Sequence, residues 1–186
     1  MNIVVLAGIP GTGSTTVLNK VLENIDYVNI NYGNVMFDIA QEKGLVAGRD
    51  DMRKLDPKIQ KEVQQEAAIK IHKMAENDDV IIDTHCTIKT PKGFLPGLPI
   101  WVLEELKPTQ FILIEEKPSE IMYRRMNDPT RVRDVEYADE IDLHQEVSRA
   151  TAMSYAVQTG ATVAVVQNND DDGLEKAVYE ILEILS

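Results

Sequence analysis

Five short runs of β-branched and other apolar residues alternate along the chain with longer segments of helical periodicity. Strands that are apolar at consecutive positions are typical of sheets buried on both faces, and parallel strands need a crossover connection between them. The pattern therefore predicts an α/β fold with a five-stranded parallel sheet and helices on both faces. The expected strands span residues 2–7, 27–31, 79–83, 110–115 and 161–167.

The clearest helix signal begins after Asp56, because this capping residue is followed by Pro57 at the first helical position. Beyond it, apolar residues recur every three or four positions and predict one buried face. These residues are Ile59, Val63, Ala67, Ile71 and Met74. Two further helices are expected at residues 139–159, before a glycine, and at residues 174–185.

The composition limits the compartment and the classes of partner. The length of 186 residues suits a single domain, residues 1–186. A net charge of -12 argues against a broad surface for nucleic acid or a membrane, since anionic partners of this size need basic faces. The N-terminal residues MNIVVLAGIPG have no basic signal-peptide start, and the single cysteine, Cys86, excludes an internal disulfide. A cytoplasmic location is therefore expected.

The stretch GIPGTGSTT, from Gly8 to Thr16, follows the first expected strand and is typical of a phosphate-binding loop. Its three glycines let successive N–H groups point at phosphate oxygens, and the next helix adds its positive N-terminal end. The pattern puts Thr15 where a hydroxyl binds Mg²⁺, but Ser14 stands where a lysine is usual. A glycine-rich turn without a ligand is the alternative. The position between strand and helix favours the phosphate site.

Asp83 ends the buried apolar run VIID, at the sheet edge where α/β proteins bind ligands. A carboxylate there can hold Mg²⁺ or a metal-bound water beside phosphates. The alternative is an aspartate that caps the turn after the strand. His85 follows two residues later, and we assign it no role as a base because such a histidine is more often a hydrogen-bonding group.

Two clusters of arginine stand out in this acidic chain, one in GRDDMRKLDP and one in YRRMNDPTRVRD. They contain Arg49 and Arg53, which are expected to share a face if the first segment is helical, and Arg124, Arg125, Arg131 and Arg133. Arginine binds phosphate oxygens two at a time and stabilises a phosphoryl group in transfer. Some of the six can instead pair with carboxylates on solvated helix faces. Two clusters and a loop indicate two phosphate-bearing ligands.

Several segments together resemble the archaeal type of adenylate kinase, and the similarity runs from the first strand to the last helix. They are GIPGTGSTT, NYGNVMFDIA, RDDMRKLDP, DTHCTIKTPKGFLPGLP, NDPTRVRD and TGATVAVVQN. The resemblance implies a P-loop NTPase fold and the reversible reaction of MgATP with AMP to give two ADP. It also implies an AMP-binding helical region at about residues 32–78, a short lid at about residues 127–135, and a homotrimer.

The resemblance further implies roles for individual residues. Around the ATP phosphates it places Gly8, Ile9, Pro10, Gly11, Thr12, Gly13, Ser14, Thr15 and Thr16, with Asn168 near the adenine. Facing AMP it places Gly33, Met36, Arg53 on the phosphate, and the loop from Lys89 to Leu98. Phosphoryl transfer falls to Arg124 and the lid residues Arg131 and Arg133, and Mg²⁺ to Thr15 and Asp83. The side chains of Arg49 and Arg125 are less firmly placed and can point outward.

Three points stay open at this stage. The chain could be a kinase for another nucleoside monophosphate, since sheet and loop are shared among such enzymes. It could also be a non-catalytic nucleotide-dependent binding protein, in which Ser14 marks lost catalysis. The expected helix at 139–159 carries apolar residues that can serve either the core or a subunit contact, namely Ile141, Leu143, Val147, Met153 and Val157.

Overall fold

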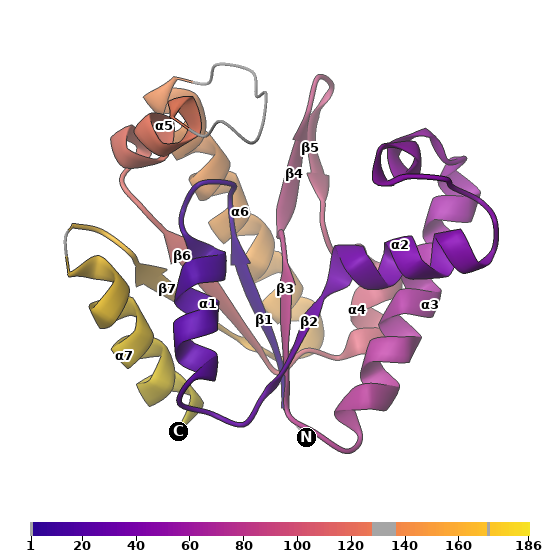
Figure 1. The fold of residues 1–186 in the computed structure, drawn as a ribbon, viewed down its shortest axis with the longest axis horizontal. Helices are drawn as coiled ribbons and strands as arrows, with labels where there is room; N and C mark the ends of the chain where they lie inside the picture. Colours follow the sequence, from indigo (N-terminus) through magenta and orange to yellow (C-terminus); the bar gives the residue numbers. More distant parts are fainter. Residues whose placement is uncertain (1, 128–136, 171) are drawn as a thin grey trace.

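The computed structural model describes residues 2–127, 137–170 and 172–186. Its centre is a five-stranded parallel sheet of order β2-β3-β1-β6-β7 (Figure 1). The strands are β1 (Ile3–Gly8), β2 (Val28–Asn31), β3 (Val80–Thr84), β6 (Gln110–Glu115) and β7 (Thr162–Gln167). The predicted sheet is confirmed, and each strand begins and ends within one residue of its expected range.

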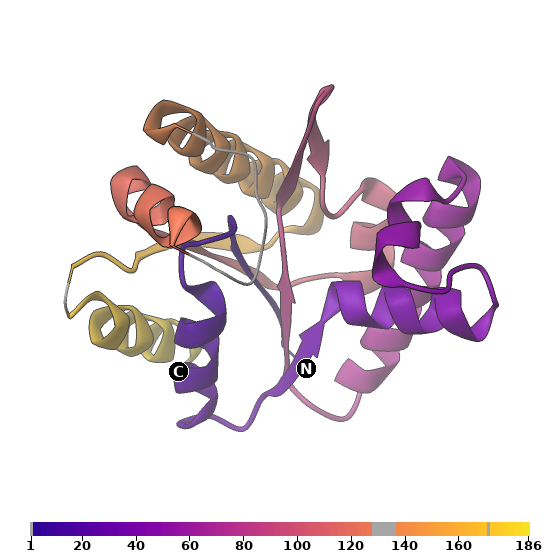
Figure 2. The same cartoon turned by 45° about the horizontal axis from the view of Figure 1, so that its top comes forward.

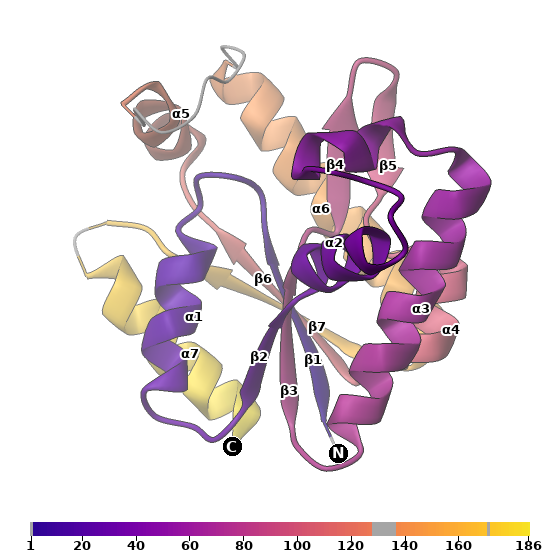
Figure 3. The same ribbon diagram turned by 45° about the vertical axis from the view of Figure 1, so that its right-hand side comes forward.

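Helices cover both faces of the sheet, as predicted. On one face lie α1 (Ser14–Leu22) and α7 (Gly173–Leu185). On the other lie α2 (Tyr32–Glu42), α3 (Pro57–Ala75), α4 (Ile100–Leu106) and α6 (Ala138–Thr159), with α3 packed along α4 (Figure 3). Consecutive strand residues point to opposite faces, so Val5 enters one apolar cluster and Leu6 the other.

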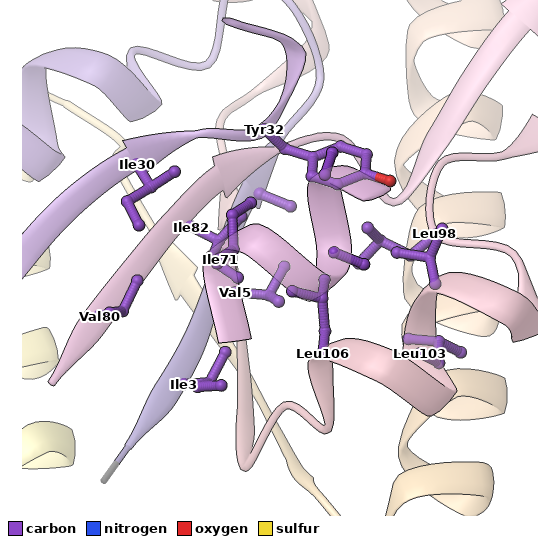
Figure 4. Close-up of a cluster of buried hydrophobic side chains, with 14 of the residues drawn as sticks. Ile3, Val5, Ile30, Tyr32, Ile71, Val80, Ile82, Leu98, Leu103 and Leu106 are labelled. Carbon is purple, nitrogen blue, oxygen red and sulfur yellow. The ribbon is translucent and has the colours of Figure 1, made fainter. Parts of the chain in front are cut away.

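The larger apolar cluster holds the sheet to α3 and α4. Figure 4 shows Val5, Ile82, Ile71 and Leu106 converging between these elements, and none of the four has exposed surface. Each such side chain contributes roughly 1.5–3 kcal/mol by leaving water. The cluster runs along β1 and β3 from their first residues, Ile3 and Val80, and so holds the strands from which the loops of the candidate site begin.

The helix expected after Asp56 forms as α3, and the Asp56 carboxylate accepts a hydrogen bond from the Lys58 N–H at 2.9 Å. Its predicted face is confirmed at Val63, which is buried with Ala67 and Ile71. The prediction was wrong for Met74, which is 41% exposed. The buried stripe instead continues four residues from Ile71 to Ala75, so Met74 faces the groove between α2 and α3.

A feature that the sequence did not predict is an antiparallel hairpin of β4 (Thr87–Thr90) and β5 (Gly93–Pro96), within the segment expected to be a functional loop. The hairpin projects from the same end of the sheet as the loop between β1 and α1 (Figure 1). Helix α6 holds its base, because the Tyr155 hydroxyl donates to the Cys86 carbonyl at 2.8 Å and accepts from the Leu98 N–H at 3.1 Å.

The remaining elements are the 3₁₀ helix η1 (Arg49–Lys54) and helix α5 (Pro118–Met126). In Figure 2, α5 and η1 lie on opposite sides of the hairpin. Apart from its first residue, 127, the predicted lid lies outside the described residues, and so do Arg131 and Arg133. None of the described helices combines the length and the apolar character that a membrane span requires.

Candidate nucleotide-binding site

The loop between β1 and α1 adopts a conformation that its glycines make possible. Gly11 has a φ of 102° and Gly13 a φ of 82°, both in the left-handed region. At Gly8 a side chain would place its Cβ 2.4 Å from the Thr12 hydroxyl oxygen. The three glycines therefore let the chain turn tightly between strand and helix.

Two side chains hold the first carbonyl oxygens of this loop. His85 Nδ1 donates to the Gly8 oxygen at 2.8 Å, and because a carbonyl can only accept, Nδ1 carries the proton. The buried Thr12 donates both its N–H and its hydroxyl to the Ile9 oxygen, at 3.2 and 3.1 Å. His85 thus has a hydrogen-bonding role, as expected.

The next two carbonyl oxygens are bound by the last turn of α5. Arg125 Nε donates to the Pro10 oxygen at 2.6 Å, and Arg124 Nη1 donates to the Gly11 oxygen at 3.3 Å. The structure therefore brings both arginines to the loop, including Arg125, which the sequence could not place. The sequence shows that the two arginines are neighbours in one cluster, but the contact of α5 with the loop depends on tertiary packing.

The end of the loop is held from the residue that follows β7. Asn168 is 7% exposed and its Nδ2 donates to the Thr12 oxygen at 2.8 Å. The same nitrogen would lie 2.7 Å from a Cβ at position 13, so Asn168 packs directly against Gly13. The Gly13 oxygen accepts from the Val17 N–H at 3.0 Å and begins α1. Asn168 is thus at the loop itself, and its predicted contact with adenine stays a prediction.

All six carbonyl oxygens of residues 8–13 accordingly accept hydrogen bonds from donors. In a trans peptide the N–H points opposite to the carbonyl of the preceding residue. The N–H groups of Gly11, Gly13 and Ser14 therefore turn away from Arg125, Asn168 and Val17, which donate to the three preceding carbonyls. Helix α1 adds its positive end beside them. This arrangement is an anion site suited to phosphate.

Asp83 lies beside the loop at the end of β3, level with Leu6 of β1. It is half-buried, and its Oδ2 accepts a hydrogen bond from Asn31 Nδ2 at 3.0 Å. The Asn31 side chain also caps α2 by accepting from the Asn34 N–H at 3.0 Å. Sequence reasoning missed Asn31, although an asparagine between a strand and a helix is a capping signal.

The α1 side of the site carries the hydroxyls. Ser14 is half-buried at the start of α1, and Thr15 and Thr16 are exposed in its first turn. The described residues contain no group of three or more histidine, cysteine, aspartate or glutamate side chains that could hold a metal. A cation here would have to take ligands from single side chains and from a bound phosphate.

The predicted AMP side is formed by α2 and η1. Gly33 lies in the first turn of α2, and Met36 is half-buried against the core. Arg53 is exposed on η1, and the Arg49 Cζ lies 5.7 Å from the centroid of the Phe37 ring. In a 3₁₀ helix residues three apart eclipse, so the expectation that Arg49 and Arg53 share a face is wrong.

The two predicted AMP residues at the ends of the loop from Lys89 to Leu98 lie in very different surroundings. Lys89 is exposed on β4, and its Nζ donates to Glu140 Oε1 in the first turn of α6 at 3.3 Å. Leu98 has no exposed surface and packs in the core. Gly97 allows this close approach, because a Cβ there would lie 1.8 Å from the His85 oxygen. The Leu98 side chain therefore supports the hairpin and does not face the site.

Burial shifts the pKa of a thiol and a phenol hydroxyl at the base of the hairpin. It raises the pKa of the Cys86 thiol to about 12 and that of the Tyr155 hydroxyl to about 12. At neutral pH the Cys86 thiol is protonated and is not a nucleophile. Neither group is therefore ionised at neutral pH.

Comparison with known proteins agrees with this geometry. An AAA domain family model matches residues 7–142. Among solved structures, a shikimate kinase from Bacteroides thetaiotaomicron superposes with a TM-score of 0.58 at 16% identity, covering 99% of this chain and 98% of that one. A sugar kinase from Janibacter gives a TM-score of 0.58 at 15% identity, with 100% and 94% covered. These likenesses confirm the P-loop kinase fold.

Sequence relatives are much closer. The adenylate kinase of Methanothermobacter thermautotrophicus is 57% identical over 185 residues, covering 100% of both chains. Those of Methanopyrus kandleri and Methanocaldococcus jannaschii are 52% and 51% identical, covering 97% and 98% of this chain and 96% and 97% of theirs. The chain therefore belongs to the family of the AAA domain model and to the adenylate kinase family, and its activity is that of an ATP:AMP phosphotransferase.

Proposed function

We propose that this chain transfers the γ-phosphoryl group of ATP, held by loop residues 8–16, to AMP held between η1 and the hairpin. The observation that carries the proposal is the loop, whose carbonyl oxygens from residue 8 to residue 13 all accept hydrogen bonds, while the N–H groups of Gly11, Gly13 and Ser14 turn away from the donors to the preceding carbonyls. The products are two molecules of ADP, and the reaction is reversible.

Positioning and charge supply the catalysis in this proposal. The AMP phosphate is ionised at neutral pH and attacks the γ-phosphorus in line, so no side-chain base is needed. Arg124 lies at the loop, where its guanidinium can stabilise charge on the transferring group. Arg131 and Arg133 are proposed to join it from the lid at about residues 127–135, which would also exclude water and suppress ATP hydrolysis.

The residues at the loop suit a magnesium ion delivered with ATP. Magnesium in such sites takes one or two protein oxygens and completes its shell with phosphate and water. The Asp83 carboxylate is fixed at one oxygen by Asn31 and the Thr15 hydroxyl is exposed beside the loop, so single oxygen ligands of this kind are present. When bound, the ion would neutralise phosphate charge. Chelation with EDTA should therefore abolish ADP formation.

The Arg53 guanidinium is proposed to bind the phosphate of AMP, with Gly33, Met36 and Lys89 near the nucleoside. Arg53 is exposed on a helix that has no buried residue, so it is accessible to a second nucleotide. The experiment that tests the acceptor is ADP formation from MgATP with AMP, CMP, UMP or GMP. A clear preference for AMP is expected. Faster turnover with CMP, UMP or GMP would favour the alternative of another nucleoside monophosphate kinase.

A homotrimer is proposed as the assembly, with α6 and the edge strand β7 in the contact. On α6, Leu143, Met153 and Val157 are 50%, 54% and 82% exposed, and Val165 on β7 is 38% exposed. Ile141 is buried, so the apolar residues of this helix divide between core and surface. Sedimentation should give three times the 20.9 kDa chain mass, and Val157→Glu should lower it. A wild-type mass near 20.9 kDa at micromolar concentration would exclude the trimer.

The single-domain organisation of residues 1–186, with its AMP-binding region at about residues 32–78, and the cytoplasmic location are likewise proposals. The free Cys86 thiol supports a reducing compartment, because it is buried and has no disulfide partner among the described residues. Imaging of a tagged chain in cells would test the location.

A further inference from the structure

Two consecutive glutamates lie where β6 leaves the sheet, and each forms an ion pair with an arginine of a different helix. Glu115 is 4% exposed and pairs with Arg149 of α6. Glu116 is 2% exposed and pairs with Arg124 of α5. Buried carboxylates are costly unless they are paired and hydrogen-bonded, so both pairs need a structural or functional reason.

Glu116 is held by hydrogen bonds at both ends. Its backbone N–H donates to Gln145 Oε1 at 3.2 Å, and its carbonyl oxygen accepts from Gln145 Nε2 at 3.1 Å. Its Oε1 accepts from the Lys117 N–H at 2.8 Å, and its Oε2 accepts from Arg124 Nη2 at 2.7 Å. Gln145 of α6 thus holds the Glu116 backbone, and the Lys117 N–H and Arg124 hold its carboxylate.

Arg124 lies between this fixed carboxylate and the phosphate-binding loop. Its Nη1 donates to the Gly11 oxygen at 3.3 Å and would lie 3.5 Å from a Cβ at Gly13. The Arg124 side chain is 43% exposed, whereas that of Glu116 is 0% exposed. Both Nη atoms are thus anchored in the protein, one on the loop and one on Glu116, while part of the Arg124 side chain stays exposed to solvent.

We propose that Glu116 is a positioning residue for phosphoryl transfer, which aims Arg124 at the phosphates of ATP. A free arginine side chain samples many rotamers, and fixing it before the ligand arrives removes that entropy cost from the reaction step. The inference rests on the proposed contact of Arg124 with ATP. It adds Glu116 and Gln145 to the residues on which turnover depends.

Glu115 offers a matched comparison. Its carboxylate accepts from Arg149 Nε at 2.6 Å and Nη2 at 2.8 Å, and from Gln167 Nε2 at 3.0 Å. The hydrogen bonds that Arg149 donates to Glu115 raise the pKa of Arg149. These partners tie α6 and β7 to β6, and none of them donates to the loop. Glu115 is therefore buried and ion-paired like Glu116, but its partner Arg149 donates no hydrogen bond to the phosphate-binding loop, whereas Arg124 donates one.

The test compares Glu116→Gln with Glu115→Gln in the intact chain. Both changes remove one buried charge and should lower the melting temperature to a similar extent. Glu116→Gln should in addition lower kcat about 10- to 100-fold with little change in KM for AMP. Glu115→Gln should keep the kcat of the folded protein. Equal kcat values for the two variants would overturn the inference.

A double-mutant cycle with Arg124→Ala separates the inference from the function on which it rests. If Glu116 acts through Arg124, adding Glu116→Gln to Arg124→Ala should cause no further loss of kcat. Independent, multiplicative losses would overturn the positioning role. If Arg124→Ala alone leaves kcat unchanged, the proposed contact of Arg124 with ATP fails first.

A second variant covers the case in which Glu116→Gln does not fold. Glu116→Asp keeps the charge but shortens the side chain by one methylene, so Arg124 loses its anchor while the ion pair stays possible. The inference predicts a lower kcat for Glu116→Asp, and a wild-type kcat would overturn it. In Gln145→Ala the backbone of Glu116 loses its support from α6, so kcat should fall. Adding Gln145→Ala to Arg124→Ala should cause no further loss of kcat.

Discussion

The two proposed nucleotide sides of this molecule, the ATP side at the loop and the AMP side at η1, differ in how much of the protein holds them. On the ATP side, carbonyl oxygens of the loop accept hydrogen bonds from His85, Arg125 and Asn168, which come from three distant parts of the chain. On the AMP side, η1 contains no buried residue. Its contacts include the neighbouring pairs of Asp51 with Gly48 and with Lys54.

The ATP-side loop is thus held from distant parts of the chain without a ligand, whereas η1 has no buried residue and rests largely on exposed, short-range contacts. A loop fixed by long-range hydrogen bonds presents its N–H groups without rearrangement, which favours binding and catalysis. A helix held by local contacts opens at low energy, as ligand-closing segments commonly do. Substitutions should therefore act through structure on the ATP side and through direct ligand contact on the AMP side.

The largest effect is expected from Gly13→Ala, with Gly44→Ala as its matched control. Both glycines have positive φ, 82° and 66°, so either methyl group costs roughly 1–2 kcal/mol of backbone strain. At Gly44 the methyl group meets nothing within 4 Å, but at Gly13 it meets Asn168 Nδ2 at 2.7 Å. We expect kcat/KM for ATP to fall about 10²-fold only in Gly13→Ala. Steady-state kinetics with varied ATP measure this, and similar losses in both variants would mean that strain alone matters.

The next largest effect is expected from Arg53→Ala, which should weaken the binding of AMP but not that of ATP. Loss of a guanidinium on the acceptor phosphate costs about 1.5–3 kcal/mol, the size of a hydrogen bond to a charged group. Arg49→Ala is the control, since its guanidinium lies over the Phe37 ring and such exposed contacts are worth roughly 0.5–1 kcal/mol. Titration calorimetry with each nucleotide gives the two affinities. An equal loss for ATP would show that Arg53 is misassigned.

Ser14→Lys tests whether the loop needs the missing lysine. If the loop N–H groups, Mg²⁺ and the arginines neutralise the phosphates, the wild-type chain should turn over at about 1–100 per second. The added ammonium should strengthen the binding of ATP by up to ~1–3 kcal/mol through charge-assisted contacts. Its effect on kcat should stay below about tenfold, because it binds ground and transition states alike. A nearly inert wild type rescued about 10³-fold by the lysine would contradict this account.

The smallest effect is expected when the pH is lowered, and it should be confined to the amide protection of η1. Hydrogen bonds from Lys54 and from the Gly48 N–H lower the pKa of Asp51 below its ordinary value of 3.8. A lowered folded-state pKa means that the contribution is present above the unfolded value and is lost as pH falls through the folded one. Amide-exchange protection in η1 should therefore drop below about pH 4, with no matching change in residues 9–13. In Asp51→Asn this pH dependence should vanish, and its persistence would assign it to another group.

Local patterns predicted the sheet and the loop well. The five apolar runs gave the strands to within one residue, because burial on both faces leaves a continuous apolar signal. Gly8, Gly11 and Gly13 marked the loop, since its backbone needs glycine at these positions. The cap at Asp56 likewise fixed the start of α3.

Features that depend on long-range packing were not predictable in the same way. The hairpin is pinned by Tyr155, which lies 57 residues from Leu98, and nothing in the segment itself indicates that contact. Arg125 and Glu116 became part of the site only through the approach of α5 to the loop. Leu98 was assigned to AMP by resemblance, whereas its buried side chain supports the core.

The phosphate-binding loop should be ordered before ATP binds. NMR relaxation of the ligand-free chain measures this directly, through the order parameters of the Gly11, Gly13 and Ser14 amides. We expect values of about 0.85, as in rigid backbone, that ATP leaves unchanged, with lower values in η1 that rise when AMP binds. Values below about 0.6 in the free loop that rise only with ATP would contradict the claim.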